Sequence, residues 1–354
     1  MSIRHLIDFT DFTAEQWREI IKLSLDIKSA PKEYSHSLSG KILATMFYEP
    51  STRTQMSFQT AMFRMGGQVI GFNDGETSSA AKGECVKDTV LMVSGYADVI
   101  AVRHPREGAA KAMSLYSACP VINAGDGGHL HPTQTLADLV TLYEKAGRTD
   151  NLTIGFCGDL KYGRTVHSLA KALCRNDGNK FVFISDKSLS IPDYVKAEIS
   201  RSGCAYSQTD SLEQAIGDLD VLYMTRIQKE RNKRSQRAKN KLILSGSVLD
   251  GAKKDMLVMH PLPRVDEITK EVDSDPRAVY FEQAYNGLYS RMALLLKLHS
   301  PEFLNTDKKS DTVIYQNAEC LNKNCITVTD GYLPAGKINK DGKYYCEYCE
   351  HECK

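Results

Sequence analysis

The sequence predicts an α/β protein with two parallel-sheet domains and a cleft between them, followed by a small C-terminal zinc-binding β domain. Short apolar runs alternate with helical patterns in two successive series, as expected for parallel strands joined by helices. The two series span about 290 residues, which exceeds one ordinary core. Five of the ten cysteines crowd the C-terminal end, which indicates a separate metal-bound unit.

The composition excludes several functional classes. Hydrophobic residues make up 42% of the 354 residues and charged residues 25%, which is typical of globular proteins. The net charge of +1 gives no bulk attraction to nucleic acid or to an acidic membrane. The N-terminal residues lack an apolar signal core, and no apolar run approaches the roughly 20 residues needed to span a bilayer. We therefore expect a cytoplasmic protein with no nucleic-acid or membrane partner.

The first series begins with a helix and continues with four strands. Thr13 and Gln16 form a capping-box pattern, and apolar residues recur at helical spacing from Trp17 onward. The predicted strands are 42–47, 68–72, 99–102 and 120–124. The predicted helices cover 14–24, 58–65, 90–96 and 136–143.

The second series contains four more strands. The predicted strands are 152–156, 181–184, 219–224 and 256–259. The predicted helices are 166–173 and a closing helix over 286–299. The expected domains are 1–136 joined by the closing helix 286–300, 137–285, a polar linker 301–311, and 312–354.

Ser51, Thr52, Arg53 and Thr54 lie where the first strand passes into a helix. A helix N-terminus presents unpaired N–H groups and the positive end of the helix dipole, which suit a phosphate or a carboxylate. The Arg53 guanidinium adds donors that match phosphate oxygens. The pattern predicts an anion site, although the hydroxyl residues alone are also compatible with simple helix capping.

Other strands also end in polar residues. Arg103 ends one strand of the first series, and His131 follows another. Ligand sites in parallel sheets lie beyond the carboxyl ends of the strands, so we expect Arg53, Arg103 and His131 to converge. In the second series, Arg226 and the His260–Arg264 segment follow strands in the same way.

Three segments have two interpretations each. The loop 73–84 carries Ser78 and Lys82 and is either a solvated surface loop or a functional one. The run 226–241 holds eight Lys and Arg residues but no interleaved aromatics, which favours a loop beside an anion site over a nucleic-acid patch. The turn 155–158 lacks the third glycine of a dinucleotide fingerprint, and we reject that interpretation.

The terminal cysteines form two close pairs, Cys320 with Cys325 and Cys346 with Cys349. This spacing predicts one tetrahedral Zn²⁺ held by four thiolates, with disulfides as the alternative. A segment of some 40 residues cannot bury a core of its own, so the metal would supply its folding free energy. Cys353 is an additional thiol, either a spare or a competing ligand.

Five motifs occur in a characteristic order: Ser51-Thr52-Arg53-Thr54, Arg103-His104-Pro105, His131-Pro132-Thr133-Gln134, Arg226-x-Gln228 and His260-Pro261-Leu262-Pro263-Arg264. With these motifs, residues 1–305 resemble the carbamoyltransferases, and among them the catalytic chains that act on aspartate. Residues 312–354 resemble the zinc domain of the regulatory chain of the same enzyme. The nucleotide-binding half of that regulatory chain has no counterpart here.

The resemblance implies transfer of the carbamoyl group of carbamoyl phosphate to the amino group of L-aspartate, giving N-carbamoyl-L-aspartate and phosphate, with no organic cofactor. The implied carbamoyl phosphate-binding residues are Ser51, Thr52, Arg53, Thr54, Arg103, His131, Gln134, Pro261 and Leu262, of which Thr54, Arg103, His131 and Gln134 are catalytic. The implied aspartate-binding residues are Lys82, Arg164, Arg226, Gln228 and Leu262. Glu49, Arg164 and Arg231 resemble residues that link the domains in the closed form.

The resemblance also implies an assembly. Ser78 and Lys82 match a loop that enters the neighbouring subunit's site, which requires at least a trimer. The zinc domain would hold one structural Zn²⁺ per chain and contact another subunit. The chain departs from the family at Gln55, where many relatives carry a second arginine. The rival interpretations are a transferase for another amino acid, such as ornithine, and a non-catalytic scaffold or regulatory subunit.

Overall fold

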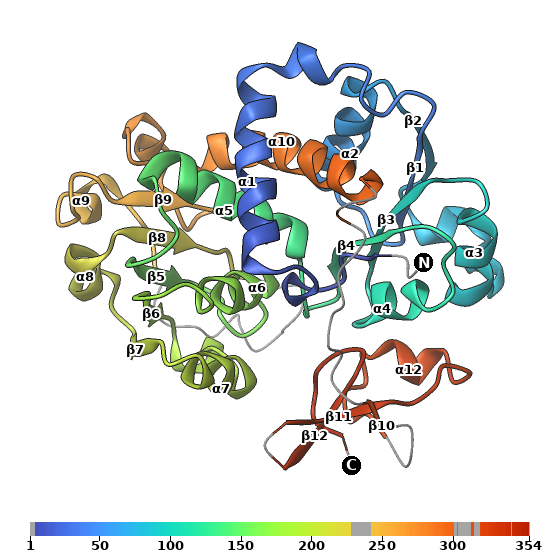
Figure 1. Cartoon of the computed structure of the whole chain (residues 1–354). Helices are drawn as coiled ribbons and strands as arrows, with labels where there is room; N and C mark the ends of the chain where they lie inside the picture. The colour runs from blue at the N-terminus through green and yellow to red at the C-terminus, as the bar shows by residue number, and fades with distance from the viewer. Residues whose placement is uncertain are drawn as a thin grey trace. The chain divides into compact units, whose positions relative to one another are not determined.

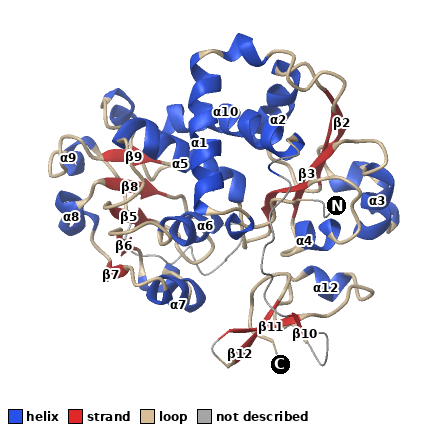
Figure 2. Cartoon of the chain, viewed as in Figure 1, coloured by secondary structure: helices blue, strands red, loops and turns tan. Residues whose placement is uncertain are grey.

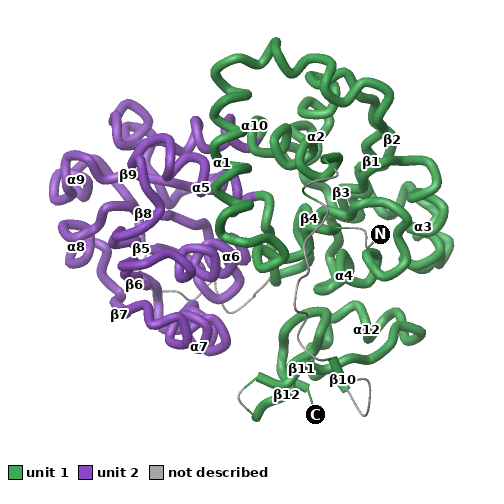
Figure 3. Tube along the Cα trace, viewed as in Figure 1, with its two compact units in different colours: residues 1–133, 288–354 green, residues 134–287 purple. Residues whose placement is uncertain are grey.

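The computed structural model describes residues 4–227, 242–300, 303, 313–314, 319–340 and 342–353. The chain divides into two compact units, Met1–Thr133 with Leu288–Lys354 and Gln134–Gly287 (Figure 3). Helices and strands alternate along both units, as the sequence predicts (Figure 2). None of the described helices is long and apolar enough to cross a membrane.

The first unit contains a parallel sheet with the strand order β2-β1-β3-β4 (Figure 1). The strands are β1 (Ile42–Phe47), β2 (Gln68–Phe72), β3 (Val99–His104) and β4 (Val121–Asp126). β1 and β4 are buried along nearly their whole length, as expected for parallel strands covered on both faces. The four predicted strands are confirmed to within two residues at each end.

The first unit contains the four predicted helices, one of them misplaced, and the short helix Ala109–Ser114, which was not predicted. The helices of this unit are α1 (Ala14–Ser29), α2 (Thr52–Arg64), α3 (Val86–Val93), α4 (Ala109–Ser114), the start of α5 (Pro132–Ala146) and the end of α10 (Tyr280–His299). The capping box at Thr13 and Gln16 is present. The prediction of a helix over 90–96 was wrong at both ends. The chain turns after Val93, where the Tyr96 N–H donates to the Val93 carbonyl at 2.9 Å.

The C-terminal segment, residues 313–353, is here called the cysteine module. It consists of β10 (Val313–Ile314), α12 (Ile326–Thr329), β11 (Lys337–Lys340) and β12 (Lys343–Cys346), and its strands form an antiparallel sheet. The short strands and turns expected there are confirmed. Ile326, Leu333 and Tyr348 are buried in the same apolar cluster as Val90 of α3 and Met113 of α4. The module therefore extends the core of the first unit.

The second unit contains a parallel sheet with the strand order β7-β6-β5-β8-β9. The strands are β5 (Thr153–Cys157), β6 (Lys180–Ile184), β7 (Ala205–Thr209), β8 (Val221–Met224) and β9 (Leu257–Met259). The helices are α6 (Arg164–Leu173), α7 (Asp193–Arg201), α8 (Leu212–Ala215), α9 (Gly246–Leu249) and the remainder of α5 and α10. With the first sheet, this confirms the predicted fold class of two parallel-sheet α/β domains.

Candidate active site and metal centre

The turn from β1 into α2 lies beside the end of β3. Phe47 is in register with Arg103, and the Tyr48 N–H donates to the Arg103 carbonyl at 2.8 Å. Ser51 is the N-cap residue of α2, but its side chain makes no cap hydrogen bond. The interpretation of Ser51 as a simple capping residue is therefore wrong.

The start of α2 is a set of donors without partners. Among the described residues, the hydroxyl groups of Ser51, Thr52 and Thr54 make no hydrogen bond, and Arg53 makes no ion pair. Thr54 is 8% exposed, whereas Arg53 is exposed. Desolvation lowers the pKa of Arg53, but a guanidinium stays charged in proteins. These groups, with the first N–H groups of α2, can surround an anion of several oxygens.

Gln55, the departure from the family pattern, has a structural contact. Its Nε2 atom donates to the Phe72 carbonyl at 3.2 Å and so joins α2 to the end of β2. The amide therefore fixes the helix that carries the anion site, although it adds no charge.

Arg103 lies at the end of β3 and is held by an acid of the same unit. Its guanidinium is 2.7 Å from Glu49 Oε1, and both side chains are mostly buried. The pair fixes a cation next to the start of α2. The predicted role of Glu49 in linking the domains stays a prediction.

His131 follows β4, and β4 pairs with β3 through His104 and Asp126. The His131 side chain is buried, and its Nδ1 atom is 3.4 Å from the Thr133 hydroxyl. Because β1, β3 and β4 are neighbours in one parallel sheet, the anion site, Arg103 and His131 lie at the same edge of that sheet.

Two other histidines at this edge have opposite charge states. Burial lowers the pKa of His104 to about 4, and its Nδ1 atom accepts the Arg106 N–H at 3.0 Å. Burial would also lower the pKa of His129, but Asp126 and Glu350 raise it to about 10. The Asp126 and Glu350 carboxylates lie 3.1 Å and 3.4 Å from its ring nitrogens. At neutral pH His104 is therefore neutral and His129 is charged.

Ser78 and Lys82 lie in an irregular segment that contains two short 3₁₀ turns, Gly75–Thr77 and Ser79–Lys82. The Ser78 hydroxyl donates to the Gly75 carbonyl at 2.8 Å and accepts the Ala80 N–H at 3.3 Å. Lys82 is exposed and forms no ion pair within the described residues. Its ammonium group is thus accessible to a ligand or to another chain.

In the second unit, Gln134 is oriented by a buried carboxylate that the sequence analysis missed. The Gln134 Nε2 atom donates to Asp138 Oδ1 at 2.8 Å. Asp138 also accepts hydrogen bonds from Gln283 at 2.6 Å and from the Tyr223 hydroxyl at 2.9 Å. Because the Gln134 NH₂ group is engaged, its carbonyl oxygen is left to accept a hydrogen bond. The four-residue spacing of Gln134 and Asp138 on one helix was the available signal.

The remaining candidates of the second unit follow neighbouring strands. Arg164 begins α6 after β5, Arg226 follows β8, and Pro261 and Leu262 follow β9. These strands are adjacent in the order β5-β8-β9, so the residues that follow them lie at one edge of the second sheet. Gln228 and Arg231, with most of the basic run 226–241, lie outside the described residues.

Leu262 has an unusual backbone conformation, with a φ of 52°. A side chain other than glycine in this region is strained by about 1–2 kcal/mol, and such residues cluster at functional sites. The Leu262 N–H donates to His260 Nδ1 at 2.8 Å, so the proton of this imidazole is on Nε2 and is donated to Glu267 Oε1 at 2.7 Å. The sequence analysis missed Glu267, which fixes this turn through His260.

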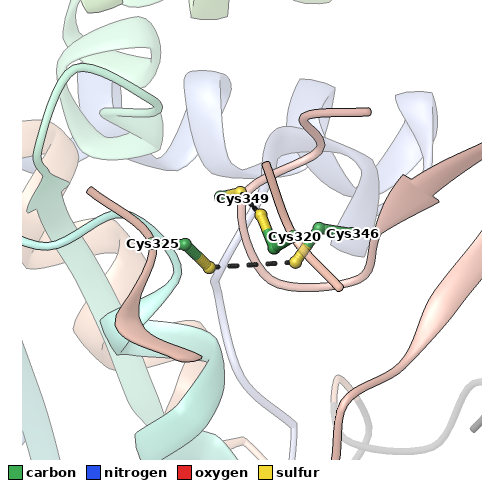
Figure 4. Close-up of side chains that lie close together, drawn as sticks. All are labelled: Cys320, Cys325, Cys346 and Cys349. Carbon is green, nitrogen blue, oxygen red and sulfur yellow. Dashed lines mark hydrogen bonds between the residues drawn. The ribbon is translucent and has the colours of Figure 1, made fainter. Parts of the chain in front are cut away.

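The four predicted metal ligands lie together in the cysteine module (Figure 4). Cys320 Sγ is 3.5 Å from Cys349 Sγ, and Cys325 Sγ is 3.8 Å from Cys346 Sγ. Four thiolates at about 2.3 Å from a central Zn²⁺ are about 3.8 Å apart, whereas a disulfide needs about 2.05 Å. All four cysteines are unbridged. The sulfur positions therefore fit a tetrahedral metal site and contradict the disulfide alternative.

Two further observations concern the thiols. Hydrogen bonds among the four thiols lower the pKa of Cys325 but raise the pKa of Cys346 and Cys349, so the thiols share their protons while no metal holds them. Cys353 does not belong to the four-sulfur group, and its Sγ lies 4.0 Å from the His351 carbonyl. Four ligands complete a structural zinc site without it.

Comparisons with known proteins agree with this arrangement. Residues 4–144 match the family described as aspartate/ornithine carbamoyltransferase, carbamoyl-P binding domain, and residues 150–298 match its Asp/Orn binding domain. The chain belongs to the aspartate/ornithine carbamoyltransferase family. The aspartate carbamoyltransferase catalytic subunit of Clostridium acetobutylicum is 57% identical over 299 residues, which are 83% of this chain and 97% of that protein. The corresponding subunit of Clostridium kluyveri is 55% identical over 298 residues, with the same coverage.

Solved structures show the same similarity. The catalytic subunit of M. jannaschii aspartate transcarbamoylase superposes with a TM-score of 0.77 at 45% identity, covering 84% of this chain and 98% of that one. Aspartate transcarbamoylase from Trypanosoma cruzi, in complex with carbamoyl phosphate and aspartate, gives a TM-score of 0.77 at 37% identity, covering 83% and 94%.

Proposed function

We propose that this chain transfers the carbamoyl group of carbamoyl phosphate to the amino group of L-aspartate, giving N-carbamoyl-L-aspartate and phosphate. The observation that carries the proposal is the group of unpartnered donors at the start of α2, next to Arg103 and His131 on one sheet edge. The names of the similar proteins support the same reaction. Carbamoyl phosphate binding is assigned to 1–136 with the closing helix 286–300, and aspartate binding to 137–285.

The donors divide between the two ends of carbamoyl phosphate. Ser51, Thr52, Arg53 and Thr54 hold the phosphate with the N–H groups of α2, and Arg103 touches the phosphate as well as the carbonyl oxygen. Thr54, Arg103 and His131 hydrogen-bond the carbonyl oxygen and stabilise the negative charge that develops there. The carbamoyl NH₂ group donates to the Gln134 side-chain oxygen and to the backbone carbonyls of Pro261 and Leu262.

The reaction is a direct displacement. The neutral amine of aspartate attacks the carbonyl carbon, and a C–N bond forms. The bond from that carbon to the phosphate oxygen then breaks, and the departing phosphate accepts the proton that the amine loses. Nearby positive charge keeps the amine pKa low enough for attack. The protein contributes positioning and electrostatic stabilisation rather than a covalent nucleophile.

Aspartate is the acceptor because the second unit presents cations. Arg164, Arg226 and Gln228 bind the two carboxylates, and Lys82 and the Leu262 backbone complete the site. A paired assay with aspartate and ornithine tests this directly. Turnover with aspartate alone supports the assignment, and turnover with ornithine alone contradicts it.

The chain acts as a trimer or a multiple of one. Large apolar side chains are exposed on α2 and β2, including Phe63 at 59%, Met56 at 60% and Ile70 at 40%, which is a pattern of interaction surfaces. Ser78 and Lys82 then enter the neighbouring site. Mixing inactive Lys82→Ala and Arg53→Ala chains should restore part of the activity. In a mixed trimer, some sites combine the unchanged Arg53 of one chain with the unchanged Lys82 of its neighbour. No recovery after confirmed subunit exchange would contradict the shared site.

The cysteine module binds one structural Zn²⁺ through Cys320, Cys325, Cys346 and Cys349, and it corresponds to the zinc domain of the aspartate carbamoyltransferase regulatory chain. Metal analysis of the purified chain should give one zinc per chain. Cys346→Ala should abolish zinc binding, whereas Cys353→Ala should leave it unchanged.

A further inference from the structure

Helix α3 has no cap of its own and is capped by the cysteine module. Its N-cap residue, Cys85, makes no side-chain cap hydrogen bond. Instead the Val86 N–H donates to Asp330 Oδ2 at 3.4 Å, and the Lys87 N–H donates to the Tyr332 hydroxyl at 3.1 Å. The Tyr332 hydroxyl donates to Asp330 at 2.7 Å. Two of the first N–H groups of α3 therefore depend on residues about 245 positions away.

A second contact joins the module to the turn after β3. The Glu107 N–H donates to the Asn324 carbonyl at 3.0 Å, and the Ile326 N–H donates to the Glu107 carbonyl at 2.9 Å. The Glu107 carboxylate is buried and accepts a hydrogen bond from Asn322 at 2.7 Å. These backbone bonds bracket Cys325, one of the predicted metal ligands. A metal bound to Cys325 would therefore fix the segment that pairs with Glu107.

A third contact lies beside another ligand. Glu350, which follows Cys349, is 3.4 Å from the ring of buried His129. Close packing accompanies it, since a Cβ atom added to Gly108 would lie 2.5 Å from the Tyr348 Cβ atom. The three contacts join α3, the turn after β3 and the turn after β4 to the cysteine module, which carries the candidate metal ligands.

We propose that the metal-bound cysteine module is a clamp within its own chain, holding the N-terminus of α3 and the turn after β3. Segment 73–85 enters α3 directly, and Glu107 lies four residues after Arg103. The clamp therefore sets the positions of Ser78, Lys82 and Arg103 without touching substrate. The contacts by themselves support the clamp, whereas its effect on catalysis rests on the proposed roles of Ser78, Lys82 and Arg103.

The test uses the full zinc-loaded chain and the Asp330→Ala variant. Hydrogen exchange of the Val86 and Lys87 amides should become about five- to tenfold faster, the effect expected for loss of a helix cap. The KM for carbamoyl phosphate should rise while zinc content stays at one per chain. Asp330→Asn should restore both values, because asparagine caps helices as well as aspartate. Glu352→Gln, at an exposed carboxylate of the same module, should change neither.

Chelation of the unmodified chain provides a second measurement. Verified loss of zinc should accelerate the same amides at least as much as Asp330→Ala does. Unchanged exchange in both cases would overturn the clamp and leave the proposed function intact. A zinc-loaded chain with no activity toward aspartate, but with exchange that responds as expected, would overturn the proposed function and leave the clamp.

Discussion

Replacing Thr54 by valine tests the central assignment, because it removes one hydroxyl and preserves the side-chain shape. The Thr54 hydroxyl makes no hydrogen bond with the described residues, so its removal breaks none of these bonds. Helix propensities of threonine and valine are similar. We therefore expect the free energy of unfolding to change by less than about 0.5 kcal/mol.

The effect on catalysis should be much larger. Thr54 is 8% exposed, so a hydrogen bond to the carbonyl oxygen would form away from bulk water. Loss of one such donor typically lowers kcat by about 10²–10³-fold, and we expect the lower end because Arg103 and His131 remain. Initial rates at saturating concentrations of both substrates measure kcat, and Thr54→Ser, which keeps the hydroxyl, is the control. A Thr54→Val variant with kcat within about twofold of the unmodified chain would refute the role of this hydroxyl.

Three further predictions follow from the structure. Asp138→Asn should lower the free energy of unfolding by about 1–2 kcal/mol in chemical denaturation, because three hydrogen bonds lose a charged acceptor. The free energy of unfolding should fall as the pH drops from about 6.5 to 4, because His104 takes up a proton in the unfolded chain but stays neutral in the folded chain. Replacing this histidine, in His104→Gln, should remove about 2–3 kcal/mol of that fall. Gly108→Ala should weaken zinc retention against a chelator, whereas Gly203→Ala, with a similar φ but open space, should not. Equal retention by both variants would contradict the packing argument.

Eight of the nine described strands of the two parallel sheets could be predicted from sequence, most of them because they are buried apolar runs bounded by polar residues. The exposed, polar strand β7 lacks this signal and was not predicted. The same rule located Arg103 and His131, since a residue that follows a parallel strand lies at a known edge of the sheet. The order of the five motifs then indicated that the residues at these sheet edges serve one reaction. The four cysteines could be identified as candidate metal ligands because their spacing alone defines two close pairs.

Residues that act through distant partners could not be predicted. Asp138 gains its role from Tyr223 and Gln283, which are brought to it by other elements. Its sequence neighbours show a helix pattern and the four-residue spacing to Gln134, but they give no sign of Tyr223 or Gln283. The positive φ of Leu262 likewise depends on its surroundings, because leucine has no local preference for that conformation.

The misplaced boundary of α3 has the same origin. Apolar spacing alone places the helix near Val90, and Cys85 gives no capping signal that would move its start back to Val86. Asp330 and Tyr332 supply that signal from the cysteine module. A local rule for helix starts failed because the cap is a tertiary contact, supplied by residues about 245 positions away.

Several polar groups next to the anion site have partners within the described structure, whereas the hydroxyls in it do not. Gln55 binds the Phe72 carbonyl, Glu49 binds Arg103, and Asp126 accepts hydrogen bonds from Gly108 and Leu130. Folded proteins rarely leave clustered polar groups unused, because each donor without a partner costs free energy on desolvation. The hydroxyls of residues 51–54 and the Arg53 guanidinium lack partners in the described structure, although their neighbours have them. That contrast supports the proposed anion site at the start of α2, where oxygens of the substrate would accept these hydrogen bonds.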